Sequence, residues 1–212
     1  LNVHGYWLVD DAKMSKSLGN VVEPLAMVEK YGLAAFRYSL LREMHFGSDA
    51  SFSEQALVAR LNADLANDLG NLFSRVLSMA KKYFSGVTPE PAAYLEPDTA
   101  IQELASTATA NFQQLFDNVQ FSRGLEALWE LVRALNKYVD ETQPWALAKA
   151  NDTERLGTVV YVMLESMRKV ARHVWPVMPE AAEAMLAQLG APFDPASGDL
   201  GREVEAWGLL EP

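Results

Sequence analysis

The sequence of 212 residues contains no cysteine. This absence excludes disulfide bonds, cysteine nucleophiles and thiolate metal sites, and it fits a reducing compartment. Histidine is scarce, and His4, His45 and His173 lie far apart in the sequence, so we predict no zinc or other metal site. No apolar run is long enough to cross a bilayer and no signal peptide is recognisable. We therefore expect a cytoplasmic protein with no membrane partner.

Basic residues are also fewer than acidic ones. The sequence has 18 Lys and Arg against 28 Asp and Glu, a net charge of -10. The excess of acid is smallest in residues 1–50, larger in residues 51–150 and largest relative to length in residues 151–212. Because the whole molecule repels polyanions, a nucleic acid would have to bind at a local patch that differs from the rest of the surface.

Apolar residues are abundant, at 50% of the sequence, and most recur at helical spacing. The opening stretch NVHGYWLVDD predicts a short strand. Helices are predicted over residues 24–44 with a possible break at Gly32, from Ser53 to about Tyr83, and over residues 99–119, 122–141, 153–174 and 177–189. Connections are predicted at residues 45–52 and 140–152, and an irregular tail packed loosely on the surface at residues 191–212. The fold class is therefore mainly α, an antiparallel helical bundle preceded by a short strand and loop.

The stretch KMSKS places Lys13 and Lys16 three residues apart in a loop of small and polar residues. Two mobile ammonium groups, helped by hydroxyl and free backbone N–H groups, can cradle a phosphate. Positive charge that acts while phosphate charge develops lowers a reaction barrier. A pair of lysines on a solvated loop needs no function, so the spacing alone does not decide between these readings.

A second polar pattern lies in the long predicted helix, where Asn67, Asn71 and Arg75 recur every four residues and share one face. Amide and guanidinium groups suit the base edges of unstacked nucleotides. The alternative is an ordinary solvated face, which is the commoner origin of such a pattern. Farther along, Pro144 fixes the chain direction before Trp145, whose indole could stack on a base. Candidates for phosphate contacts are Arg75, Lys81, Lys82 and Lys149.

The run KMSKSLGNVVEP resembles the signature loop of class I aminoacyl-tRNA synthetases. The continuation LAMVEKYGLAAFRYSLLREMHFGSDASFS is similar to methionyl-tRNA synthetases, and the resemblance extends to about residue 190. It implies that Lys13, Met14, Ser15, Lys16 and Ser17 form a loop that closes over ATP. In that loop Lys16 would stabilise the pyrophosphate leaving group, and Lys13 would assist binding and closure.

The same resemblance implies that Asn67, Asn71, Arg75, Pro144 and Trp145 read the CAU anticodon, with Trp145 stacked on its first base. The H-I-G-H motif, methionine pocket and metal-bearing insertion of that family are absent, and His4–Gly5 is not that motif. The sequence begins without Met, inside what reads as a strand. We therefore expect a C-terminal fragment that by itself binds no cofactor and forms no adenylate.

The expected division is a catalytic-domain end with its connector in residues 1–50, an anticodon-binding domain in residues 51–190, and a tail in residues 191–212. The full-length ligase would join L-methionine to tRNA(Met) using ATP with Mg²⁺, and the fragment would bind the anticodon stem-loop. One alternative is a fragment of a valine, isoleucine, leucine or cysteine synthetase. Another is a helical module that binds proteins and no RNA.

Overall fold

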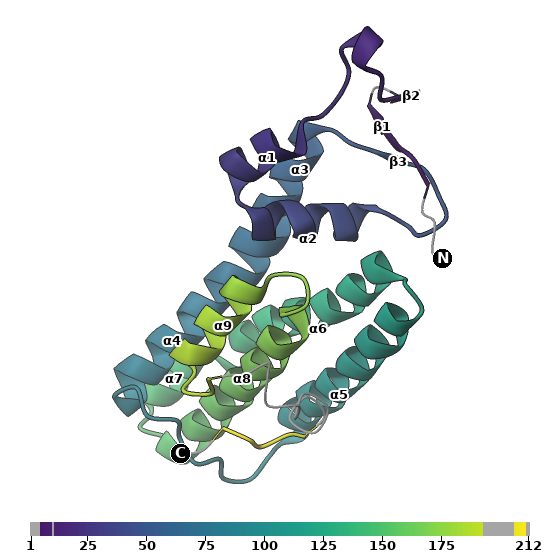
Figure 1. Ribbon diagram of the computed structural model, residues 1–212. Coiled ribbons are helices and arrows are strands. Elements are labelled where there is room, and N and C mark those ends of the chain that lie inside the picture. The colour runs from purple at the N-terminus through teal and green to yellow at the C-terminus, as the bar shows by residue number, and fades with distance from the viewer. Residues whose placement is uncertain (1–4, 10, 193–205, 211–212) are drawn as a thin grey trace.

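The computed structural model describes residues 5–9, 11–192 and 206–210. A small sheet and two short helices stand above a bundle of long helices, and one long helix runs from the upper part into the bundle (Figure 1). This arrangement confirms the predicted helical bundle with a short strand and loop before it. Within the described ranges, no helix has the length and apolarity needed to cross a membrane.

The upper part contains three short strands, β1 (Trp7–Val9), β2 (Ala12–Lys13) and β3 (Ala50–Ser51). β1 lies in the middle, antiparallel to β2 and parallel to β3. The strand predicted at the start of the chain is confirmed at residues 7–9. The prediction of a plain connection over residues 45–52 is wrong at β3, because two residues carry no alternating pattern and become a strand only by pairing with β1.

Two helices follow the loop, α1 (Pro24–Tyr31) and α2 (Leu33–Glu43), and the predicted break between them is confirmed. At the break Gly32 has φ 84°, a conformation that other residues adopt at a cost. The next helix, α3 (Glu54–Arg60), begins as predicted after Ser53, whose Oγ accepts the Ala56 N–H at 3.0 Å.

The helix predicted from Ser53 to about Tyr83 is continuous, but its middle is not an α-helix. After α3 come the π-helix η2 (Leu61–Gly70) and then α4 (Asn71–Phe84). The N–H of Asn71 donates to the carbonyl of Ala66, five residues back. A π-helix is wound more loosely than an α-helix, so η2 rotates α4 relative to α3.

Side chains of the neighbouring helix α6 (Phe121–Thr142) stabilise this winding. Trp129 Nε1–H donates to the carbonyl of Asp64 at 3.3 Å, and Asn136 Nδ2 donates to the carbonyl of Asp68 at 3.1 Å. These bonds come from residues two turns apart on α6. The π-helix is therefore held by tertiary contacts that no local sequence pattern announces.

The buried side chain of Asp64 joins the upper part to the bundle. Its carboxylate accepts the Tyr38 hydroxyl of α2 at 2.6 Å and lies 3.4 Å from Arg42 Nε. Arg42 also pairs with Glu126 of α6. Burial, followed by the hydrogen bond to Asp64, raises the pKa of Tyr38, so this hydroxyl stays a donor. The upper part and the bundle are thus joined by a polar network around the buried Asp64.

The remaining helices form the bundle with α4 and α6: α5 (Glu96–Asp117), α7 (Pro144–Lys149), α8 (Thr153–Val174) and α9 (Pro179–Gln188). The four longer helices predicted after residue 95 are confirmed. The prediction of a plain connection over residues 140–152 is wrong, because α6 extends to Thr142 and α7 occupies about half of the stretch. Proline at its first position supplies a fixed φ and removes an N–H that would lack a partner.

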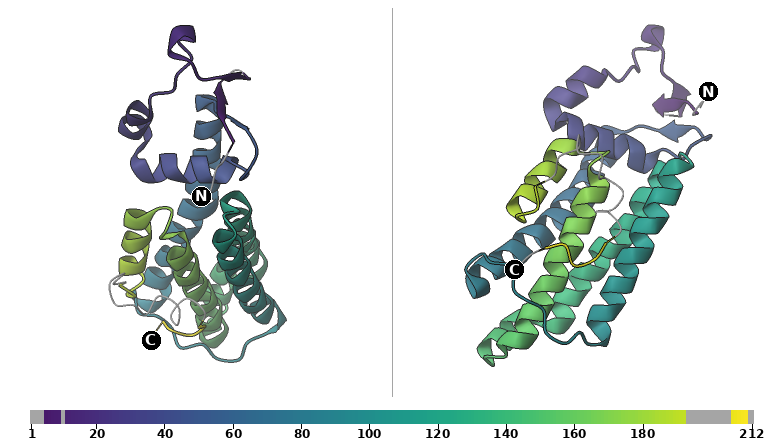
Figure 2. Two further views of the ribbon diagram at one scale, coloured as in Figure 1. Left: turned by 45° about the vertical axis from the view of Figure 1, so that its right-hand side comes forward. Right: turned by 60° about the horizontal axis from the view of Figure 1, so that its bottom comes forward.

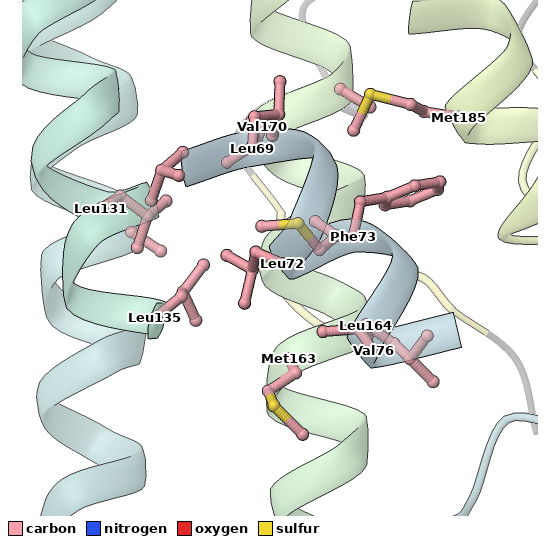
Figure 3. Packing of buried hydrophobic residues seen from close by; sticks show 14 of the residues in the cluster. Leu69, Leu72, Phe73, Val76, Leu131, Leu135, Met163, Leu164, Val170 and Met185 are labelled. Carbon is pink, nitrogen blue, oxygen red and sulfur yellow. The ribbon is translucent and has the colours of Figure 1, made fainter. Parts of the chain in front are cut away.

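Helix α8 is the centre of the bundle, and each of its side chains from Leu156 to Val174 is buried. It lies between α9 on one side and α5 on the other in both views of Figure 2. Figure 3 shows Leu72 and Val76 of α4 pointing into the core, in the same layer as Leu135 and Met163. All four are fully buried.

The end of the described chain returns to α8 and is anchored there. The buried Glu165 carboxylate accepts the backbone N–H groups of residues 208–210, the first at 3.0 Å. Arg168 Nη2 donates to Glu165 at 2.6 Å and to the Ala206 carbonyl at 2.9 Å. The expectation of loose packing is therefore wrong for residues 206–210, because a buried ion pair some 40 residues earlier binds their backbone. The rest of the predicted tail, from residue 193 to 205 and at residues 211–212, lies outside the described residues.

Helices α5 and α6 approach closely at Gly124, and this contact gives a testable prediction. A Cβ added at Gly124 would lie 2.6 Å from the Phe116 ring, which is itself stacked on Phe112 with centroids 3.9 Å apart. Gly124→Ala should lower the free energy of unfolding, measured in urea, by about 1–3 kcal/mol. Gly157→Ala is the matched control on α8, where the nearest atom would be 3.5 Å away. It should raise stability by up to about 1 kcal/mol, and equal effects at both sites would contradict the close approach.

Candidate functional site

The lysine loop rises from the small sheet at the top of Figure 1. Lys13 ends β2, where it pairs with Leu8 of β1, and its Nζ lies 3.8 Å from the centre of the Tyr6 ring. Lys16 begins the short 3₁₀ helix η1 (Lys16–Leu18), and both lysines are exposed. The structure thus places two cations on one protruding loop whose base is fixed by strand pairing.

The groups on this loop suit phosphate oxygens better than a metal ion. Ser15 and Ser17, on either side of Lys16 in the sequence, have their hydroxyl oxygens 2.8 Å apart. In the described part of the chain, no cluster of three or more His, Asp or Glu side chains could hold a metal ion. Ammonium and hydroxyl groups donate hydrogen bonds, so the loop can bind an anion.

Asn67, Asn71 and Arg75 are all exposed on the long helix, as a binding role requires. Asn67 lies in η2, whereas Asn71 and Arg75 lie in α4. The α-helical spacing that predicted one stripe therefore holds only for Asn71 and Arg75. Because η2 is wound more loosely, the direction of Asn67 does not follow from the α-helical spacing that relates Asn71 to Arg75.

Pro144 and Trp145 begin α7, with Pro144 buried and Trp145 49% exposed. The preceding Gln143 has φ 45° and ends α6, so the chain turns sharply just before Trp145. The Gln143 carbonyl then accepts the Ala146 N–H at 2.8 Å. The buried proline and the turn fix the backbone, while the large indole stays half in solvent.

A shallow depression of about 290 Å³ brings Trp145 together with Arg75. Its lining residues are Ser74, Arg75, Ser78, Met79, Lys82, Tyr83, Val139 and Trp145. Asn67 and Asn71 lie outside this lining, toward the upper end of the same helix. Of the three candidate lysines, Lys82 lines the depression and Lys149 does not. Lys81 lines a different one, between α4 and α9.

Several residues of this depression were not predicted from the sequence. Ser74, Ser78 and Lys82 recur every four residues on α4, and that spacing could have revealed them as a second stripe. Asp140 pairs with Arg75 at 3.2 Å, with side chains 70% and 42% exposed. An ion pair this exposed contributes little to stability, so Arg75 can exchange it for another acceptor.

The face of the helix that leads to this depression is free of exposed acid. Within residues 55–82, every one of which the structure describes, the exposed positions carry Gln, Ala, Asn, Gly, Ser, Arg or Lys. The two acids of this segment are Asp64, which is buried, and Asp68, which is half-buried. Burial and then the charge of Asp64 raise the pKa of Asp68. On a protein of net charge -10 this helix face is a local exception, although the exposed Asp140 of α6 lies beside it at Arg75, so a polyanion meets less repulsion here than the net charge implies.

Two family models match the chain in succession. The class I tRNA synthetase model of type M matches residues 1–77, and the anticodon binding domain of methionyl tRNA ligase matches residues 88–205. The second match alone covers more than half of the chain. The boundary between them falls near the end of α4, so the lysine loop lies in the first match and Trp145 in the second.

Known proteins agree with these matches. The methionine–tRNA ligase of Caldanaerobacter subterraneus subsp. tengcongensis is 46% identical over 90% of the chain, which covers 30% of that relative. The ligase of Thermotoga maritima is 41% identical over 99% of the chain and is covered to 33%. A solved structure of Mycobacterium tuberculosis methionyl-tRNA synthetase in complex with methionyl-adenylate superimposes with a TM-score of 0.90 at 39% identity. It matches 99% of this chain and is itself covered to 41%.

The chain thus spans about a third of the length of these curated relatives. Along the chain the lysine loop comes first, the joint at Asp64 follows, and most of the helical bundle comes last, in the order of the two family matches. This chain belongs to the methionyl-tRNA synthetase family and contains that family's anticodon-binding domain.

Proposed function

We propose that this chain is the C-terminal part of a methionine–tRNA ligase and that its bundle binds the CAU anticodon of tRNA(Met). The observation that carries the proposal is the half-exposed indole of Trp145 beside Arg75, at the end of a helix face without exposed acid. A stacking platform next to a guanidinium group suits an unstacked base.

In this proposal each group has one task. Trp145 stacks on the first anticodon base, and Pro144 holds the backbone that presents it. Asn67, Asn71 and Arg75 hydrogen-bond base edges from the long helix. Lys82 contacts a phosphate beside the depression, while Lys81 and Lys149, which lie outside it, contact the flanking stem. Contact with few phosphates fits a protein of net charge -10.

The lysine loop serves the other half of the proposed reaction. In the whole ligase a carboxylate oxygen of L-methionine bonds to the α-phosphorus of ATP, the bond to the β-phosphate oxygen breaks, and pyrophosphate leaves. Lys16 stabilises the charge on pyrophosphate, and Lys13 with Met14, Ser15 and Ser17 completes the loop over ATP. Support comes from the loop's donor groups and from the adenylate bound in the Mycobacterium tuberculosis relative.

Mg²⁺ is proposed to arrive with ATP, and no residue of this chain is assigned to it, because the loop offers donors and no anionic oxygen. The rest of the catalytic site is assigned to the part of the ligase outside this chain. The chain by itself should therefore bind no ATP and form no adenylate.

The proposal also includes the division of the chain into a catalytic-domain end with its connector up to residue 50, an anticodon-binding domain up to residue 190, and a tail. Burial of Leu72 and Val76 in the core supports placing α4 in the bundle. Because the proposed substrate is a tRNA, we also place the protein in the cytoplasm.

The experiment that tests this function is titration of the chain with an anticodon stem-loop bearing CAU and with the same stem bearing a scrambled loop. The unaltered chain should prefer CAU. Trp145→Ala should remove about 1–3 kcal/mol of stacking, which weakens CAU binding about 5- to 150-fold. Trp145→Phe should retain most of the affinity, and Tyr94→Ala, an exposed aromatic in the loop after α4, should change nothing.

Two outcomes would overturn this function. Equal binding of both loops by the unaltered chain would contradict anticodon reading. Absence of any salt-sensitive RNA binding, both by the chain and by the whole ligase, would favour a module that binds proteins.

A further inference from the structure

The lysine loop is closed at its base by a single side chain, that of Asn20. Its Oδ1 accepts the Ser15 N–H at 2.8 Å, and its Nδ2 donates to the Lys13 carbonyl at 3.2 Å. These two bonds fall on the peptide groups either side of Met14. The Asn20 amide thus pairs with the backbone as the edge of a neighbouring strand would.

The same base is held from the other side by Tyr6. The Tyr6 N–H donates to Asp49 Oδ1 at 2.7 Å, and its carbonyl accepts the Ala50 N–H at 2.9 Å. These bonds fix the backbone of Tyr6, and the centre of its ring lies 3.8 Å from the ammonium of Lys13, within the range of a cation–π contact. This contact favours one position of the Lys13 ammonium.

We propose that Asn20 is a positioning residue of the phosphate-binding loop and acts through Lys16. This inference rests on the proposed function, since it assumes that the loop works on ATP. By tying Ser15 to Lys13, Asn20 fixes the backbone from which Lys16 projects. A lysine stem has many rotamers, so its ammonium reaches a developing charge reliably only when its backbone origin is fixed.

The test is ATP–pyrophosphate exchange by the intact ligase that carries this chain. Asn20→Ala removes both bonds and should lower kcat about 10- to 100-fold, the scale of a misplaced catalytic group. The KM for methionine should not change, because the loop does not contact the amino acid side chain in this proposal. Asn111→Ala is the matched control, an exposed asparagine on α5, and should leave the rate unaltered.

Asn20→Asp separates the two bonds, because a carboxylate can still accept from Ser15 but cannot donate to the Lys13 carbonyl. Its rate should lie between those of the unaltered ligase and Asn20→Ala. The decisive measurement is Asn20→Ala in a ligase that already carries Lys16→Ala. If Asn20 acts through Lys16, the second substitution should have little further effect.

The outcomes distinguish failure of the role of Asn20 from failure of the proposed ligase function. An unaltered ligase without exchange activity would overturn both. An active ligase in which Asn20→Ala is harmless would overturn the role of Asn20 alone. So would a multiplicative loss with Lys16→Ala, or a raised KM for methionine, since either shows a general structural effect.

Discussion

Asp98→Ala should lower the free energy of unfolding by about 3–5 kcal/mol, the cost of removing one partner from a buried ion pair. Asp98 is completely buried at the start of α5. It accepts the Tyr138 hydroxyl, two N–H groups of Arg155, and the backbone N–H of Leu95 at 2.7 Å. Burial alone would raise the pKa of Asp98, but the hydrogen bonds from Arg155, Tyr138 and Leu95 outweigh it and lower the pKa.

The loss is large because three elements meet at this carboxylate: the first turn of α5, the end of α6 and the start of α8. Without it, Arg155 keeps a charge that is mostly withdrawn from water, and Tyr138 keeps a buried hydroxyl with no acceptor. Equilibrium unfolding in urea measures the effect. Glu103→Ala, an exposed acid on the same helix, should change stability by no more than about 0.5 kcal/mol. A loss below about 1 kcal/mol for Asp98→Ala would show that the cluster is not a stabilising joint.

Acid should weaken the fold through His173, by about 2–3 kcal/mol between pH 7.5 and pH 4.5. His173 is buried in α8, with its ring edge-on to Phe112 at 5.4 Å. Because a carbonyl cannot donate, the 2.7 Å contact with the Lys169 carbonyl assigns the ring proton to Nδ1. In the described structure Nε2 has no hydrogen-bond partner, so a second proton there would be buried and unpaired.

Burial, with smaller contributions from the charges of Lys169 and Arg168, lowers the pKa of His173 to about 4. Its unfolded pKa is about 6.5, so the unfolded chain binds the proton first as the pH falls. The contribution of His173 to stability is therefore complete above about pH 6.5 and is lost progressively down to about pH 4.

Urea unfolding of wild type and His173→Asn across this pH range measures the effect, since asparagine can keep a donor near the position of Nδ1. Asp98, with its lowered pKa, also loses its contribution in acid, so the histidine effect is the difference between the two curves. Parallel curves would mean that His173 is protonated in the folded protein as readily as in the unfolded chain.

Much of the bundle could be predicted from the sequence because its helices are long and their apolar residues recur regularly. Helix α8 was found within a residue at both ends, since the N-cap at Asp152 and the turn at Pro176 mark its limits. The elements that were missed depend on partners distant in sequence. β3 exists by pairing with β1, and η2 is held by Trp129 and Asn136 of another helix.

The candidate site likewise has residues that local patterns could identify and features that depend on distant parts of the chain. Short patterns and a family resemblance were enough to select Lys16, Asn71 and Trp145. The depression that joins Arg75 to Trp145 could not be predicted, because it depends on how α4 packs against the end of α6. Asn20 was passed over for a similar reason: its role lies in two bonds to backbone groups, which leave no trace in residue type or spacing.

The π-helix makes this protein unusually sensitive to chain length at a place where the sequence looks uninterrupted. A single deletion between Leu61 and Gly70 could be absorbed by tightening η2 toward an α-helix. The helix would survive, but α4 would turn about its axis relative to α3, carrying Arg75 away from Trp145 and Leu72 out of the core. Insertions in the irregular segment between α4 and α5 leave both the Arg75 side and the Leu72 side of α4 in place. Among sequences of this kind, variation in length should therefore collect in that segment, while the ten residues of η2 keep a constant count.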